Sequence, residues 1–187
     1  MASLAGGAGA ELVKAGGGND SLWGEADGDT LNGNAGDDAI FGGTGADRLI
    51  GARGIDTVWG EDGDDTLVMG YDGDDVVYGG AGADRFVFNQ NQTGNHLIMD
   101  FEHGLDRLKI SQMLLQTPPP TGALDPALVS YGAAVGAEAQ FVLTYDAATD
   151  TSQLLWDPNG DDPSGGAYAL ARFDGAVTLT ASDITII

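Results

Sequence analysis

The sequence predicts an all-β protein, with a right-handed parallel β-solenoid over residues 15–88 and an antiparallel β region over residues 89–187. Three observations support this prediction. Residues 15–87 repeat with a period of nine, each repeat carries an apolar residue at one fixed place, and 19 of the 31 glycines lie in this stretch. Self-similarity at a short fixed period is the sequence signature of a solenoid. Residues 1–14 precede the repeats and are expected to form an N-terminal cap.

The composition excludes several classes of function. The chain has 187 residues, of which 29 are acidic and 7 basic, and its formal net charge is −22. Such a charge repels nucleic acids and anionic membrane surfaces, so we expect neither as a partner. No cysteine is present, which excludes disulfides, thiol catalysis and Cys-ligated zinc. No apolar run approaches the ~20 residues of a membrane span. The chain is 42% hydrophobic, which is enough for a folded core.

Eight nine-residue units account for residues 15–87, with Met69 as a one-residue insertion before the seventh unit. The first and fourth positions are Gly in seven of the eight units, and the eighth position is always apolar. The sixth position is always aspartate: Asp20, Asp29, Asp38, Asp47, Asp56, Asp65, Asp75 and Asp84. Each unit therefore reads as a tight turn followed by a short strand at positions seven to nine.

The period also predicts where the side chains point. Successive side chains of a strand face opposite sides, so the eighth residue faces inward and the ninth faces solvent. Two units make one coil, and coils stack about 4.8 Å apart. The aspartates then form two columns. Column one holds Asp20, Asp38, Asp56 and Asp75, and column two holds Asp29, Asp47, Asp65 and Asp84.

Stacked carboxylates require a counter-charge. Neighbours in a column repel by roughly 1 kcal/mol in water and about 3–4 kcal/mol at an effective dielectric of 20. Several such pairs rival the ~5–15 kcal/mol that stabilises a whole domain. Carboxylate and carbonyl oxygens without His or Cys nearby select Ca²⁺, because Mg²⁺ keeps its water and transition metals prefer softer ligands. The sequence therefore predicts Ca²⁺ between the turns.

At this point the chain resembles a known family. The pattern G-G-x-G-x-D-x-U-x, with U apolar, is similar to the RTX (hemolysin-type) calcium-binding repeats, which form a parallel β-roll. Gly42–Ile50 and Gly79–Val87 match it most closely. Gly82–Phe88 and Ile98–Ile110 resemble the segment that follows the roll in serralysin C-terminal domains and in R modules of mannuronan C5-epimerases.

The resemblance implies that the sixth-position aspartates and backbone carbonyls of the turn glycines hold Ca²⁺ between coils. It also implies type I secretion, an extracellular location and an uncleaved C-terminal signal. With one ion in each of three gaps per column, about six Ca²⁺ ions would bind. The implied backbone ligands are Gly16, Gly18, Gly33, Gly36, Gly42, Gly43, Gly45, Gly51, Gly54, Gly60, Gly63, Gly70, Gly73, Gly79, Gly80 and Gly82.

Two units depart from the pattern. Unit two has Asp27 where Gly is expected and Gly28 one place later, which predicts a distorted turn and a weakened site at Asp29. Met69 predicts a bulge that shifts the seventh turn.

A row of aromatic residues occupies the ninth position of alternate units. Trp23, Phe41, Trp59 and Tyr78 are expected on the outer face of one sheet, one coil apart. Contiguous exposed apolar surface marks an interaction site. Either another segment or domain covers this row, or it is a platform for polysaccharide or a protein partner.

The C-terminal region shows no catalytic motif, since neither HExxH nor G-x-S-x-G occurs. Its expected strands are His96–Phe101, Arg107–Ile110, Phe141–Tyr145, Ser152–Trp156, Tyr168–Phe173, Val177–Leu179 and Asp183–Ile187. We therefore expect a non-catalytic Ca²⁺-binding module that folds on calcium binding after type I secretion. The alternatives are a polysaccharide- or protein-binding module, or the C-terminal fragment of a larger secreted hydrolase or epimerase.

Overall fold

The computed structural model of the chain describes residues 1–89, 95–112, 115, 122–123, 129–131, 140–157 and 168–187. The roll consists of twelve strands: β1 (Ser3–Ala8), β2 (Leu12–Gly17), β3 (Ser21–Ala26), β4 (Thr30–Ala35), β5 (Ala39–Thr44), β6 (Arg48–Arg53), β7 (Thr57–Asp62), β8 (Thr66–Val68), β9 (Val76–Ala81), β10 (Arg85–Phe88), β11 (Leu97–Ile98) and β12 (Arg107–Ile110). The C-terminal region adds β13 (Gly122–Ala123), β14 (Val129–Tyr131), β15 (Gln140–Asp146), β16 (Thr151–Asp157), β17 (Tyr168–Asp174), a 3₁₀ turn (Ala181–Asp183) and β18 (Ile184–Ile186).

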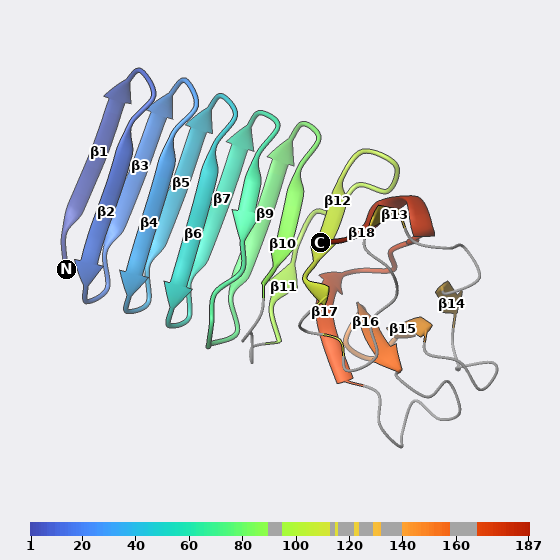
Figure 1. Cartoon of the computed structure of the whole chain (residues 1–187). Helices are drawn as coiled ribbons and strands as arrows, with labels where there is room; N and C mark the ends of the chain where they lie inside the picture. The colour runs from blue at the N-terminus through green and yellow to red at the C-terminus, as the bar shows by residue number, and fades with distance from the viewer. Residues whose placement is uncertain (90–94, 113–114, 116–121, 124–128, 132–139, 158–167) are drawn as a thin grey trace.

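The predicted solenoid is confirmed. Odd-numbered strands β1 to β11 form one parallel sheet and even-numbered strands β2 to β12 form the other, which makes six coils (Figure 1). Partners in neighbouring coils lie 18 residues apart, as in the pair Leu22 and Ile40. We call the two roll faces the odd sheet and the even sheet.

The roll begins earlier than the sequence predicted. β1 pairs with β3 and β2 pairs with β4, so residues 3–17 form the first coil, and residues 1–14 are not a separate cap. The reason is visible in Gly6–Lys14, which reads as another unit with Glu11 at the sixth position and Val13 at the eighth. Accepting Glu in place of Asp at the sixth position would have revealed this unit.

The strands are longer than predicted, because most span six residues and include the first three positions of the next unit. Positive φ angles occur at the second and fourth positions and not at the first, so the expectation that the first glycine serves the turn is wrong. Unit two is regular, since Asp27 adopts φ 70° in place of Gly. Aspartate tolerates this left-handed conformation better than most residues, so the predicted distortion is wrong.

Met69 produces the predicted irregularity. β8 ends at Val68, and Met69 follows as a buried residue outside any strand. Beyond it the register between coils changes from 18 to 19 residues, as in the pair Thr57 and Val76. The insertion is thus absorbed in one turn, and the columns continue past it.

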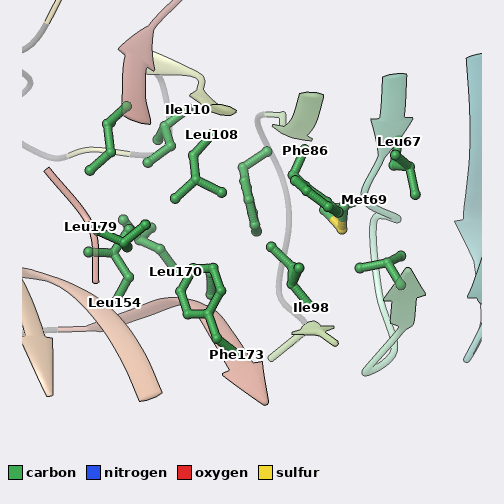
Figure 2. Close-up of a cluster of buried hydrophobic side chains, with 14 of the residues drawn as sticks. Leu67, Met69, Phe86, Ile98, Leu108, Ile110, Leu154, Leu170, Phe173 and Leu179 are labelled. Carbon is green, nitrogen blue, oxygen red and sulfur yellow. The ribbon is translucent and has the colours of Figure 1, made fainter. Parts of the chain in front are cut away.

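The core is a line of eighth-position side chains between the two sheets. Leu22, Leu31, Ile40, Leu49 and Leu67 have no exposed surface. Figure 2 shows the line continuing through Phe86, Ile98 and Leu108 to Leu154, Leu170 and Phe173 of the C-terminal region. The roll and the C-terminal strands therefore share one hydrophobic core, which buries the open end of the roll.

The C-terminal strands extend both sheets. β17 joins β11 in the odd sheet and continues antiparallel through β16 and β15, while β18 pairs parallel with β12 in the even sheet. The predicted antiparallel region is confirmed, but Val177–Leu179 is not a strand and Leu179 packs in the core from a coil segment. Among the described residues, no helix is long and apolar enough to cross a membrane.

We predict that Leu49→Ala destabilises the chain by about 2–5 kcal/mol, because a fully buried side chain leaves a cavity between two tightly spaced sheets. Thermal unfolding of the folded protein measures the effect. Ile55→Ala is the matched control, since Ile55 is 58% exposed in the adjacent turn and should change stability by less than about 0.5 kcal/mol. Equal losses in both variants would contradict the assigned core.

Candidate metal centre

The sixth-position carboxylates form two ordered columns, as predicted. In column one the backbone N–H of Asp20 donates to Oδ1 of Asp38 at 2.7 Å, Asp38 donates to Asp56 at 2.9 Å, and Asp56 donates to Asp75 at 2.9 Å. Column two repeats this pattern from Asp29 to Asp84, with distances of 2.6 to 2.9 Å. Each aspartate is thus tied through one carboxylate oxygen to the coil before it.

The second carboxylate oxygen is buried without a partner in most of the units. The unpaired atoms are Oδ2 of Asp29, Asp38, Asp47, Asp56, Asp65 and Asp84, together with Oε2 of Glu11. A buried carboxylate oxygen without a donor is costly, and a row of them is rare in a folded protein. A cation at these oxygens would remove the cost.

Glycine at the first position leaves room for this carboxylate. A Cβ added at Gly51 would collide with Oδ2 of Asp56, and the same holds for Gly33 with Asp38. The equivalent glycines 42, 60, 70 and 79 face the carboxylates of their own units in the same way. The first position is therefore small because the carboxylate occupies that space.

The fourth-position glycines bring carbonyl oxygens into a second line. A Cβ at Gly54 would collide with the carbonyl of Gly36, and a Cβ at Gly73 with that of Gly54. Gly18, Gly45, Gly63 and Gly82 also have positive φ angles, as do Gly16, Gly43 and Gly80 at the second position. The turns of the nine-residue units thus bring carboxylate and main-chain oxygens close together. Among the described residues no group of three or more His, Asp or Glu side chains is placed to hold a metal, so the backbone would have to supply ligands.

The structure extends column two at both ends. The backbone N–H of Glu11 donates to Oδ1 of Asp29 at 2.7 Å, and the N–H of Asp84 donates to Oδ1 of Asp106 at 3.0 Å. Column two therefore runs from Glu11 to Asp106. The sequence signal for Glu11 was present in Gly6–Lys14, whereas Asp106 lies outside the nine-residue period and only the fold places it in the column.

Burial raises the pKa of these carboxyls in the ion-free roll. For Asp56, burial together with the charges of Asp75 and Asp38 raises the pKa to about 7, against the lowering effect of the Asp38 N–H. Burial and the charges of Asp47 and Asp84 likewise raise the pKa of Asp65 to about 7. The pKa of Asp84 is raised to about 6, again chiefly by burial.

The aromatic row is a stack of rings. Trp23 and Phe41 are 5.7 Å apart between ring centroids, Phe41 and Trp59 are 4.5 Å apart, and Trp59 and Tyr78 are 5.7 Å apart, with the ring planes within 9° of parallel in each pair. Each inner ring therefore has its faces against its neighbours and presents its edge to solvent. Trp23, at the end of the stack, is the most exposed at 36%.

These features define a parallel β-solenoid whose turns are lined by buried, unpaired carboxylate oxygens. The family model of the RTX calcium-binding nonapeptide repeat matches residues 5–40, 41–70 and 67–90. Residues 5–90, which make up most of the roll, thus match RTX calcium-binding nonapeptide repeats. No curated protein matches the sequence.

Of three solved structures compared with this chain, one has a TM-score above 0.5. The AlgE6R3 subunit of the Azotobacter vinelandii mannuronan C5-epimerase has a TM-score of 0.51 and 21% identity, covering 92% of this chain and 80% of that one. The AlgE6R2 subunit of the same enzyme has a TM-score of 0.45 and 20% identity, covering 87% and 89%. The extracellular lipase LipA of Serratia marcescens has a TM-score of 0.32 and 14% identity, covering 91% and 38%.

The raised pKa values predict a pH dependence. The folded, ion-free roll holds protons on Asp56 and Asp65 up to about pH 7, whereas the unfolded chain releases them near pH 4. The ion-free roll is therefore least stable above pH 7 and gains stability as the pH falls from about 7 towards 4. Circular dichroism of the chain in chelator should show more β-structure at pH 5 than at pH 8, and an unchanged spectrum would contradict the prediction.

Proposed function

We propose that this chain is a non-catalytic calcium module whose roll folds when Ca²⁺ enters the gaps between successive carboxylates of the two columns. The row of buried, unpaired Oδ2 atoms is the observation that supports this most directly. In each gap the ligands are the sixth-position carboxylates and main-chain carbonyls of the turn glycines. This oxygen-only set favours Ca²⁺ over Mg²⁺, which requires smaller octahedral sites and keeps its water.

Calcium binding and folding would be one event. The turns that hold the ions bring together residues 18 or 19 positions apart, so the sites do not exist in the unfolded chain. Without the ions, each coil adds another buried carboxylate to a column of like charges. We infer that the roll of the ion-free chain is disordered near neutral pH, where these carboxylates are charged.

We further propose that the chain folds after type I secretion. Extracellular calcium sites typically have Kd values of ~10⁻⁴–10⁻³ M, which cytosolic free Ca²⁺ does not fill. The chain would then cross the secretion machinery unfolded and fold outside. The shared core supports a role of the C-terminal strands as the starting point for the roll, because they bury its last coil.

A calcium titration tests the proposal. Circular dichroism should show a cooperative gain of β-structure with Ca²⁺ and none with equal Mg²⁺ at pH 8. Asp56→Asn should raise the Ca²⁺ concentration at the midpoint of folding about tenfold, because it removes a buried ligand charge. This shift corresponds to about 1.4 kcal/mol of binding free energy. Asp62→Asn removes the same charge at an exposed site and should leave the midpoint within about twofold.

The outcome that contradicts the calcium proposal is a chain fully folded in chelator at pH 8. An equal response to Ca²⁺ and Mg²⁺ would remove the claim of calcium selectivity while leaving a cation-dependent fold.

A second candidate function is binding of an acidic polysaccharide on the even sheet. Six of the seven basic residues lie on strands of this sheet: Lys14, Arg48, Arg53, Arg85, Arg107 and Lys109. Arg48 and Arg53 line a hollow of about 720 Å³ together with Asn32, Asn34 and Tyr71. Cations gathered on one face of an otherwise acidic protein favour an anionic ligand there.

The aromatic row is less suited to polysaccharide than the even sheet. A sugar ring stacks on the face of an aromatic ring, and the inner ring faces are taken up by neighbouring rings. We infer that the row mainly stabilises the odd sheet, as cross-strand aromatic pairs do. A fused catalytic domain in a larger secreted hydrolase or epimerase remains compatible with both functions.

The basic surface makes a separate prediction. The double variant Arg48→Glu/Arg53→Glu should weaken binding to mannuronan at least ~10-fold in calorimetry at saturating Ca²⁺, since two attractive charges become repulsive. Trp23→Ala changes the most exposed ring of the aromatic row and should leave the affinity unchanged. The opposite pattern would favour the aromatic row as the binding surface.

A further inference from the structure

Column one ends in a histidine where column two ends in a carboxylate. The residue that follows Asp75 in column one is His96, whose Nδ1 lies 3.3 Å from the backbone N of Asp75. In every earlier coil this place is taken by Oδ1 of the next aspartate, as Asp75 does for Asp56. His96 is therefore the structural equivalent of a sixth-position aspartate.

Oδ2 of Asp75 has polar neighbours that most of the other sixth-position carboxylates lack. Nδ1 of His96 lies 3.0 Å from Oδ2 of Asp75, and the backbone N–H of Gly70 donates to the same oxygen at 3.1 Å. Asp75 Oδ2 is thus not among the unpaired buried oxygens. Asp84, at the corresponding coil of column two, has its Oδ2 buried and unpaired and faces the carboxylate of Asp106.

The gap beside His96 has an imidazole in place of the second carboxylate. An imidazole nitrogen suits transition metals, whereas Ca²⁺ takes hard oxygen ligands. The ring is fully buried and its centroid lies 6.5 Å from that of Phe88, so it is held in place by packing as well.

We propose that no calcium ion binds between Asp75 and His96, so that column one ends at Asp75 as a calcium site and the two columns hold unequal numbers of ions. This inference rests on the proposed calcium function. Column one has three gaps between carboxylates, from Asp20 to Asp75. Column two has five, between successive members of the series Glu11, Asp29, Asp47, Asp65, Asp84 and Asp106. The expected total is eight ions per chain and not the six that the nine-residue period alone implied.

His96 lies where the roll joins the C-terminal strands, which gives the unequal ion numbers of the two columns a structural reason. Its carbonyl accepts the backbone N–H of Arg172 at 3.0 Å, and β11 immediately after it pairs with β17. The backbone N–H of Gly70 therefore pairs with the last carboxylate of column one, beside Nδ1 of His96, where the roll joins the C-terminal strands. This junction can form without calcium, and the coils that need calcium are then added from it towards the N-terminus.

Ion counting in the folded protein tests the inference. Native mass spectrometry of the full chain at saturating Ca²⁺ should show one additional ion in His96→Asp, because the substitution restores a carboxylate to the fourth gap of column one. His96→Leu removes the imidazole without adding an oxygen ligand or a charge and should keep the wild-type count. In column two, Asp106→His places an imidazole at the end and should lose one ion.

The three variants separate the possible failures. If wild type binds no calcium, the proposed function is wrong. If wild type binds calcium and neither His96→Asp nor Asp106→His changes the count, the assignment of no calcium ion between Asp75 and His96 is wrong although the calcium function stands. Should His96→Asp fail to fold, Asp106→His decides alone, since an unchanged count there overturns the inference.

Discussion

The buried stacking of one carboxylate per coil is the constraint on which the rest of this structure depends. Each aspartate accepts the backbone N–H of the coil before it, so the columns set the register between coils. The same arrangement leaves a buried oxygen unpaired in most units and places like charges one strand spacing apart. The roll is therefore held in register by groups that also oppose its formation, and a cation between the turns would offset their repulsion.

Other features of the chain follow from this constraint. The first-position glycines leave space for the carboxylate, and the fourth-position glycines allow carbonyls of adjacent coils to approach. The hydrophobic core of the roll consists of its eighth-position side chains and continues into apolar side chains of the C-terminal strands (Figure 2). Stability is accordingly expected to depend on two sources, calcium along the roll and apolar packing at its C-terminal end.

The two outer faces have different chemistry although they arise from the same repeat. The odd sheet carries the stacked rings together with Glu25, Glu61 and Asp62, which border a hollow over Gly43. The even sheet carries six of the seven basic residues. Because only the sixth and eighth positions serve the columns and the core, the outward positions are free to vary. A protein of net charge −22 can thereby present a cationic face.

The sequence by itself determined the period, the inward line of Leu and Ile and the two Asp columns, because each depends on spacing within a local repeat. It also showed Glu11 and Val13 in a further unit, which a strict requirement for Asp concealed. Only the tertiary structure decided that Asp106 continues column two and that His96 ends column one. Both residues lie beyond the periodic segment, where irregular connections set the distance along the chain and contacts between coils bring each residue to its place.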